Sequence, residues 1–217
     1  MAIKHTTWFT GFIAVAILHL VGQLVGQDAL HLVTKPLLMP ALLAWFLTVT
    51  PSGRFRTLVA IGLVWSWLGD LGLMPSGEAW FLAGLGAFLI AQLTYSVAFW
   101  PYRADSVLTR PVFALPYLAV LVGLLVVLWG HLGDLRLPVT VYAVVIVAMA
   151  VLATGVNRTV ALGAVLFVVS DALIALDSVA DLVQLPAHGF WVMLTYLAAQ
   201  LLIAMGVASA VRAETAG

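Results

Sequence analysis

The chain has 217 residues, of which 64% are apolar, and its nine basic and nine acidic residues give a formal net charge of zero. A soluble domain of this length carries about 54 charged residues, so the composition excludes a chain mostly surrounded by water. Zero net charge gives no electrostatic footprint for nucleic acid, and the absence of cysteine excludes disulfides, thiol nucleophiles and thiolate metal sites.

Charged and turn residues divide the apolar sequence into eight segments that predict transmembrane helices. In chain order these are Trp8–Val25, Lys35–Val49, Arg56–Met74, Ala79–Trp100, Val112–Gly130, Pro138–Thr154, Thr159–Leu176 and Gly189–Val211. We expect the first segment to be an anchor, because no cleavage site of a signal peptide follows it. The sequence therefore predicts an all-α, polytopic helix bundle. It would form a single integral membrane domain over residues 1–217, in the cell (inner) membrane.

Basic residues are distributed unevenly between the two predicted sides of the membrane. The tails and even-numbered loops contain Lys4, Arg54, Arg56, Arg103, Arg110, Arg158 and Arg212. The odd-numbered loops contain Lys35 and Arg136 together with the acids Asp28, Glu78, Asp134, Asp177 and Asp181. Because an excess of Lys and Arg marks the cytoplasmic side, both termini are predicted to face the cytoplasm.

A weak internal repeat relates positions that lie 101 residues apart. The matching pairs are Lys35 and Arg136, Gly62 and Gly163, Asp70 and Asp171, and Tyr95 and Tyr196. Four spans in each half, residues 1–104 and 105–217, would make the halves parallel and related by an axis along the membrane normal.

Two aspartates lie inside predicted spans, where an ionisable side chain is unfavourable and usually faces a cavity or a partner. Asp70 follows Arg56 by 14 residues and Asp171 follows Arg158 by 13, so both lie about 20 Å from the cytoplasmic end. We expect the two to face one another across a cavity in the outer half of the bilayer. Two close carboxylates there would share one proton and provide one acid and one base. Alternatively, each aspartate only caps a polar contact between helices or pairs with Lys35 and Arg136.

Lys35 precedes Pro36 at the predicted outer mouth of the second span. Pro36 and Pro40 are expected to free backbone carbonyls, and irregular backbone of this kind is tolerated where it lines a cavity. A lysine at such a mouth could hold a lipid phosphate as a point charge, or it could only extend to the interface.

Further polar residues recur on single faces of the first, fourth and eighth spans. They are His19, Gln23 and Gln27, then Gln92 and Tyr95, then Tyr196 and Gln200. Hydrogen bonds between helices would explain each of them alone. The functional hypothesis is that they converge with the aspartates on a common cavity. The five histidines are scattered, so we expect neither a metal site nor a cofactor.

Five segments in this order resemble the YhhN-like family of lysoplasmalogenases. They are TKPLLMP (34–40), GLVWSWLGDLGLM (62–74), FLAGLGAFLIAQLTY (81–95), LGAVLFVVSDALIAL (162–176) and TYLAAQLLIAMG (195–206). The resemblance implies hydrolysis of the vinyl ether bond of a lysophospholipid, 1-alkenyl glycerophosphoethanolamine or glycerophosphocholine, to a fatty aldehyde and a glycerophospho-base. By this resemblance Lys35, Asp70 and Asp171 fall on the polar positions of the family, and Tyr95 and Tyr196 match such positions more loosely. Gln92 departs from the histidine that is frequent in the family, and glutamine cannot transfer a proton.

The two aspartates are compatible with other membrane functions. A proton-coupled transporter could use them as proton carriers. An intramembrane aspartyl protease also uses two aspartates, one after glycine as in Gly69-Asp70. Such a protease would have a Pro-Ala-Leu segment after the catalytic pair, whereas Pro40-Ala41-Leu42 precedes it here. The lipid bilayer is the expected environment in each case, and the sequence leaves the oligomeric state open.

Overall fold

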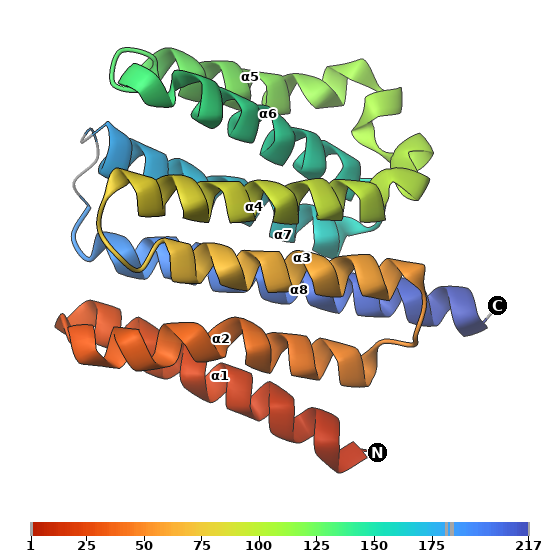
Figure 1. Cartoon of the computed structure of the whole chain (residues 1–217). Coiled ribbons are helices and arrows are strands. Elements are labelled where there is room, and N and C mark those ends of the chain that lie inside the picture. Colours follow the sequence, from red (N-terminus) through yellow and green to blue (C-terminus); the bar gives the residue numbers. More distant parts are fainter. Residues whose placement is uncertain (1, 181, 183–184, 217) are drawn as a thin grey trace. The chain divides into compact units, whose positions relative to one another are not determined.

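Within residues 2–180, 182 and 185–216, which the structure describes, the computed structural model contains eight α-helices and no strand. The helices are α1 (Ala2–Val25), α2 (Asp28–Val49), α3 (Arg54–Gly72), α4 (Glu78–Phe99), α5 (Pro111–Leu128), α6 (Arg136–Ala153), α7 (Arg158–Ile174) and α8 (His188–Ala216) (Figure 1). Three short 3-10 helices, η1 (Trp100–Asp105), η2 (Val107–Thr109) and η3 (Gly133–Leu135), and a π-helical turn, η4 (Ala175–Val179), complete the fold. The predicted all-α class is confirmed.

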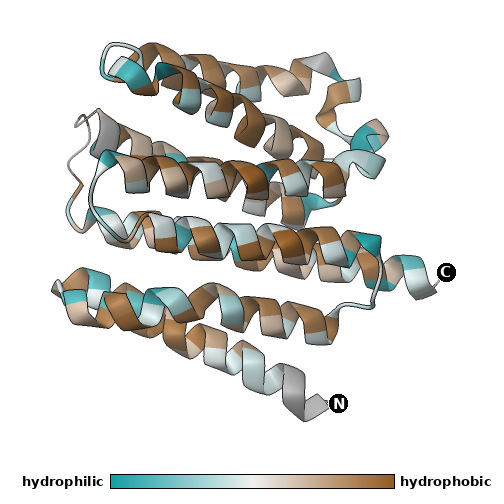
Figure 2. Cartoon of the chain, viewed as in Figure 1, coloured by the Kyte–Doolittle hydropathy of each residue, from teal (hydrophilic) through white to brown (hydrophobic). Residues whose placement is uncertain are grey.

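Six of the described helices are long and apolar enough to cross a membrane: α1, α2, α4, α6, α7 and α8. Apolar residues predominate along the ribbon (Figure 2). Several of them are exposed: Leu137 on α6, and Val112 and Val126 on α5, are each more than 70% exposed. Such exposure is expected when a helix faces lipid instead of water. The apolar part of α5 is short, and α3 contains charged residues, so the count of eight spans stays a prediction.

The described chain divides into two compact units. The first contains the chain up to Ala98 together with α8 from Ala204 onward, and the second runs from Phe99 to Ile203. Helix α8 is therefore shared between the units. The prediction of one domain and the prediction of two repeat halves both stay predictions.

The predicted and observed helices correspond one to one, and the largest error is at the start of α2. We expected this helix to begin at Lys35, but it begins at Asp28 and continues unbroken through Pro36 and Pro40. The expected irregular backbone at the prolines is therefore wrong. Pro40 cannot donate to the carbonyl of Pro36, but that carbonyl accepts a hydrogen bond of 2.9 Å from the indole N–H of Trp67 on α3.

Helix α1 ends directly before Gly26, whose φ of +67° lies in the left-handed region that glycine adopts without strain. This turn makes Gln27 the residue that caps α2 instead of a member of α1. The predicted polar stripe on α1 therefore consists of His19 and Gln23, and its extension to Gln27 is wrong.

Glycines set the packing of α3 against α4 in the first unit. The contacting pairs are Gly62 with Tyr95, Gly69 with Phe88, and Gly72 with Gly84. A Cβ atom on Gly72 would lie 2.8 Å from the Cα atom of Gly84, so the two backbones approach closely, as small residues allow in membranes. The pairs also show that the helices are antiparallel.

The second unit has its own close contacts. A Cβ atom on Gly163 of α7 would lie 2.8 Å from the carbonyl oxygen of Ala199 on α8. The repeat matches Gly163 to Gly62 and Tyr196 to Tyr95, but the nearest atoms to a Gly163 Cβ belong to Ala199 and Ile203. The contacts at these matched glycines therefore differ, and the internal repeat stays a prediction.

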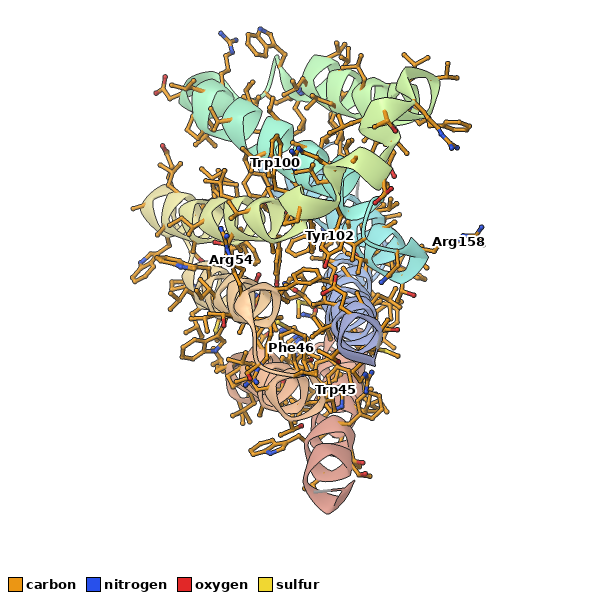
Figure 3. The ribbon with its side chains drawn as sticks, turned by 90° about the vertical axis from the view of Figure 1, so that its right-hand side faces the viewer. Trp45, Phe46, Arg54, Trp100, Tyr102 and Arg158 are labelled. Carbon is orange, nitrogen blue, oxygen red and sulfur yellow. The ribbon has the colours of Figure 1, made fainter. Side chains whose placement is uncertain are left out.

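Basic residues lie at the first positions of several helices. Arg54 and Arg158 begin α3 and α7, and Figure 3 shows the side chain of Arg158 extending away from its helix. Arg103 lies 4.9 Å from the ring centre of Trp100, an arrangement that suits a membrane interface. The side chain of Lys4 and residue Asp181 lie outside the described part of the chain, and the cytoplasmic orientation of the termini stays a prediction.

Candidate active site

Asp70 lies in the last turn of α3, and its side chain is only 3% exposed. It follows Gly69, which contacts the ring of Phe88 on α4, and it lies one turn beyond Trp67, which is hydrogen-bonded to α2. Residues three apart on a helix are neighbours on its surface. Asp70 is therefore buried in a stretch of α3 that contacts both α2 and α4.

A polar cluster joins α1 to α2 in the same unit. His19 is fully buried, and its Nδ1 atom lies 2.8 Å from the hydroxyl oxygen of Thr34, while that hydroxyl donates to the carbonyl oxygen of Leu30 at 2.6 Å. The side-chain nitrogen of Gln23 lies 3.0 Å from Nδ1 of His31. The ring centres of the two histidines are 4.6 Å apart.

The hydrogen bonds of Thr34 determine which nitrogen of His19 carries the proton. Because the single hydroxyl proton of Thr34 is donated to a carbonyl, the Thr34 oxygen accepts from His19, and Nδ1 is the protonated nitrogen. The Nε2 atom of His19 then presents a lone pair. This atom is buried and has no hydrogen-bond partner among the described residues.

Lys35 is half-buried in the second turn of α2, one turn after His31 on the same helix face. The structure therefore places Lys35 beside the polar cluster, about 10 Å along α2 from the first residue of the helix. Sequence reasoning missed His31 and Thr34, because the segment from Asp28 to Thr34 was assigned to a loop. His31 and Lys35 are four residues apart, so they lie on one face if both belong to the helix. An earlier predicted start of α2 would have made this spacing visible in the sequence.

Gln92 of α4 is fully buried, and neither its side-chain nitrogen nor its side-chain oxygen has a hydrogen-bond partner among the described residues. The hydroxyl of Ser66 on α3 is likewise buried and has no hydrogen-bond partner among the described residues. The antiparallel glycine contacts put Ser66 level with Gln92 along the helix pair. A buried polar group without a partner is unfavourable by about 1–3 kcal/mol, so this pair is typical of a place where water or a ligand binds.

Tyr95, the other candidate on α4, is fully buried with its ring against Gly62. In the second unit, Tyr196 is 3% exposed and packs edge-on against Phe167, with ring centres 5.5 Å apart. Gln200 is fully buried one turn further along α8. All three candidates therefore point into protein and not toward lipid.

Asp171 is half-buried near the end of α7, where the hydroxyl of Tyr142 on α6 donates a hydrogen bond to its Oδ2 atom. The neighbouring Ser170 donates to the carbonyl oxygen of Val192 on α8 at 3.1 Å. Sequence reasoning missed Tyr142, because a single tyrosine in an apolar helix carries no signal of spacing. The structure thus joins Asp171 to a phenol that holds one carboxylate oxygen in place.

The predicted site residues divide between the two units. The first contains Asp70, Lys35, His19, Gln23, Gln92 and Tyr95, and the second contains Asp171, Tyr196 and Gln200. The facing of the two aspartates and the convergence of these residues on one cavity stay predictions. Across the described residues, no group of three or more His, Asp or Glu side chains is placed to hold a metal ion.

Comparison with known proteins adds a family and named relatives. The model of the YhhN family matches residues 30–207. A protein of Mycobacterium bovis named "Lysoplasmalogenase" is 37% identical over 176 residues, which cover 77% of this chain and 67% of the relative. The human "Lysoplasmalogenase TMEM86B" is 35% identical over 167 residues, which cover 75% of this chain and 69% of the relative. No solved structure matches the chain.

Proposed function

Because this chain belongs to the YhhN family, we propose that it hydrolyses the vinyl ether bond of lysoplasmalogens, releasing a fatty aldehyde and a glycerophospho-base. The observation that carries the proposal is the alignment of relatives named lysoplasmalogenase over three-quarters of the chain. Helices able to cross a membrane suit a lipid substrate, and we propose the cell (inner) membrane as the location. The names of the relatives favour a lysoplasmalogenase over the proton-coupled transporter and the protease considered from the sequence.

The proposed reaction needs an acid, a base and a water molecule. A vinyl ether is hydrolysed when a proton is added to its β-carbon, which leaves an oxocarbenium ion on the ether side. Water then adds to this cation and loses a proton to the base. The resulting hemiacetal breaks its carbon–oxygen bond to give the aldehyde and the free alcohol of the glycerol. Two carboxyl groups in different protonation states can carry all these proton transfers without a cofactor.

We assign the role of acid to Asp70 and the role of base to Asp171. The hydrogen bond from Tyr142 supports this assignment, because it holds the Asp171 carboxyl group in one orientation, as a base that accepts a proton from a positioned water molecule requires. An ionised Asp171 could steady the oxocarbenium ion and accept the proton of water. Asp70 is almost completely buried, so bulk water has little access to its carboxyl group, as suits a group that gives its proton to the substrate.

Tyr142→Phe is expected to lower kcat about tenfold to a hundredfold and to leave KM unchanged, since a hydrogen bond to a charged group contributes roughly 1.5–3 kcal/mol. Steady-state release of aldehyde by the purified variant is the measurement. In an Asp171→Asn variant the same substitution should not lower kcat further, because Tyr142 acts on the reaction only by its hydrogen bond to Asp171. An equal fractional loss in both backgrounds would mean that Tyr142 acts independently of Asp171.

The polar cluster at Lys35 is our candidate for the head-group site. Lys35 supplies a positive charge, and His19, Gln23 and His31 supply hydrogen-bonding groups close to it. The buried lone pair of His19 Nε2 and the unpartnered amide of Gln92 are further positions for a polar part of the substrate. We include Tyr95, Tyr196 and Gln200 as residues that line the path of the substrate.

Lys35→Gln is expected to raise KM about tenfold and to leave kcat nearly unchanged, because a phosphate contact remote from the reacting bond stabilises ground state and transition state equally. Kinetics with a 1-alkenyl lysophospholipid measure this effect. The matched control is a 1-alkenylglycerol without phosphate, for which wild type and Lys35→Gln should have the same KM. A KM for the phosphate substrate that does not change would show that Lys35 does not bind the head group.

Purified protein in detergent should release aldehyde from a 1-alkenyl lysophospholipid, and this assay tests the proposed function. A parallel measurement of proton flux into proteoliposomes that contain the protein distinguishes an enzyme from a proton-coupled transporter. Ion flux without aldehyde release would contradict the proposal.

A further inference from the structure

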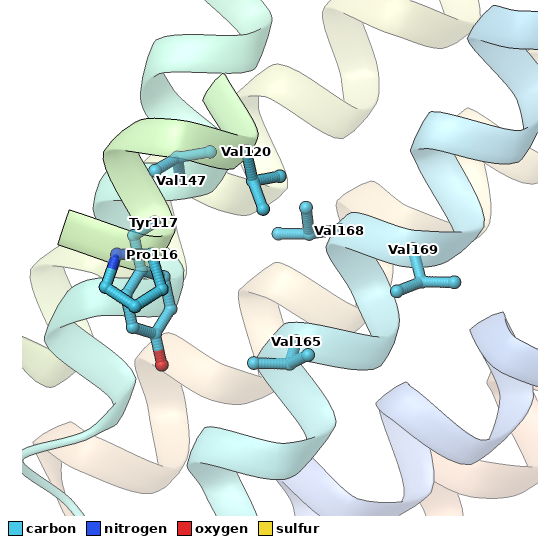
Figure 4. A pocket seen from close by; sticks show the side chains of 7 residues that line it. All are labelled: Pro116, Tyr117, Val120, Val147, Val165, Val168 and Val169. Carbon is cyan, nitrogen blue, oxygen red and sulfur yellow. The ribbon is translucent and has the colours of Figure 1, made fainter. Parts of the chain in front are cut away.

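An apolar pocket of about 280 Å³ lies between α5, α6 and α7 of the second unit (Figure 4). Its walls are Pro116, Tyr117, Val120, Val147, Val165, Val168 and Val169. None of these side chains is charged, and five of them are valines. For comparison, an engineered apolar cavity of about 150 Å³ stays dry and binds benzene. This pocket therefore has room for a larger hydrocarbon group, and the Tyr117 side chain is the one polar side chain among these wall residues.

One wall residue of the pocket, Val168, lies one helical turn before Asp171 on α7. Asp171 follows the wall residue Val168 by three positions, so the two are neighbours on the surface of α7, about 5 Å apart along its axis. Val147 lies on α6, the helix that also supplies Tyr142. The wall residues of α7 occupy the middle of that helix, whereas Asp171 lies near its end. The pocket thus extends from the neighbourhood of Asp171 toward the middle of the helix.

We propose that this pocket binds the alkyl chain of the substrate, an inference that rests on the proposed function. In a 1-alkenyl ether the saturated chain begins at the β-carbon of the double bond. A chain held in the pocket would therefore leave the double bond beside Asp171. The lipid would also keep its orientation in the membrane, with the head group near the ends of the helices and the chain directed toward their middle.

The chemistry of the pocket excludes the polar parts of the substrate. Moving a phosphate or an ammonium group into an apolar site without partners is strongly unfavourable. The hydrocarbon chain has no such penalty and contacts the valine side chains on several sides. The pocket therefore discriminates substrates by the length and bulk of the chain and not by the head group.

Val120→Trp is expected to fill the pocket from α5. It should lower kcat/KM at least tenfold for substrates with a hexadecenyl chain and leave kcat/KM unchanged for a butenyl chain, which is too short to occupy the pocket. The matched control is Val126→Trp, the same substitution on an exposed part of α5 that does not line the pocket. Equal activity of Val120→Trp and Val126→Trp toward both chain lengths would overturn the proposal.

A binding experiment keeps this inference separate from the hydrolytic activity. The probe is a 1-O-hexadecyl lysophospholipid, which has no vinyl ether, with a diazirine in the middle of the chain. Irradiation of the wild-type protein should label peptides of α5 and α7 that contain pocket residues, and excess unlabelled lipid or Val120→Trp should reduce the labelling at least fivefold. Such labelling, found in a protein that releases no aldehyde from a 1-hexadecenyl lysophospholipid, would refute the hydrolase and support the pocket. Labelling that neither competitor nor substitution reduces would mean that only bilayer lipid touches these helices, and would overturn the proposal.

Discussion

Asp70→Asn and Asp171→Asn are each expected to lower kcat/KM for lysoplasmalogen hydrolysis by at least ~10³-fold. Asparagine keeps the shape of the side chain but neither donates nor accepts the proton that the reaction transfers. The double variant should lose no more than either single variant, because residues that act as one unit are strongly non-additive. Release of aldehyde by the three purified variants, compared with wild type, measures both effects.

A loss of activity counts only if each variant is folded like the wild-type protein. Each must elute as wild type does in size-exclusion chromatography in detergent and must unfold at a similar temperature. Wild-type activity should also pass through a maximum as the pH varies, because one carboxyl group must be protonated while the other is ionised. A folded single variant with near-normal turnover would make that aspartate structural. Losses that multiply in the double variant would contradict a shared proton transfer.

Gly72→Ala is expected to destabilise the first unit by about 1–3 kcal/mol, which is typical of overpacking. The new Cβ atom would lie 2.8 Å from both the Cα and the amide nitrogen of Gly84, and backbone atoms cannot rotate away. This penalty opposes the gain of about 1 kcal/mol that alanine normally has over glycine in a helix. Activity should fall as well, because Asp70 lies two residues before Gly72 in the same helical turn.

Gly86→Ala on α4 is the matched control, because its Cβ atom would meet no atom within 4 Å. Thermal unfolding in detergent should show Gly86→Ala at or above the wild-type melting temperature and Gly72→Ala clearly below it. If both variants unfold at the same temperature, the close approach of α3 and α4 does not limit stability.

The helical fold was predictable because charge and turn residues interrupt apolar segments of membrane-spanning length. The start of α2 was not, because the charge of Lys35 and the two prolines were interpreted as its boundary. In the structure, the carbonyl freed by Pro40 is satisfied by Trp67, a contact 31 residues away in sequence that no local pattern predicts. The same error hid Thr34 and His31, which extend the cluster at His19.

The two membrane aspartates could be selected from the sequence, because an acid within an apolar span is exceptional in itself. Tyr142 could not, since its importance comes from a hydrogen bond between α6 and α7 and not from its spacing. Gln92 was selected as polar, but only the structure shows that both ends of its amide are buried without partners among the described residues. The pocket of α5, α6 and α7 was also unpredictable, because valines in an apolar helix give no sign of which of them enclose a cavity.

The most direct test of the proposed hydrolysis is to follow the products that the purified protein forms from a 1-alkenyl lysophospholipid in D₂O. We predict one fatty aldehyde for each glycerophospho-base released, with one deuterium on the carbon next to the aldehyde group, because protonation occurs at the β-carbon. The 1-alkyl and 1-acyl analogues should release no aldehyde. Folded wild-type protein that releases no aldehyde from the alkenyl lipid, or releases aldehyde without deuterium, would contradict the account.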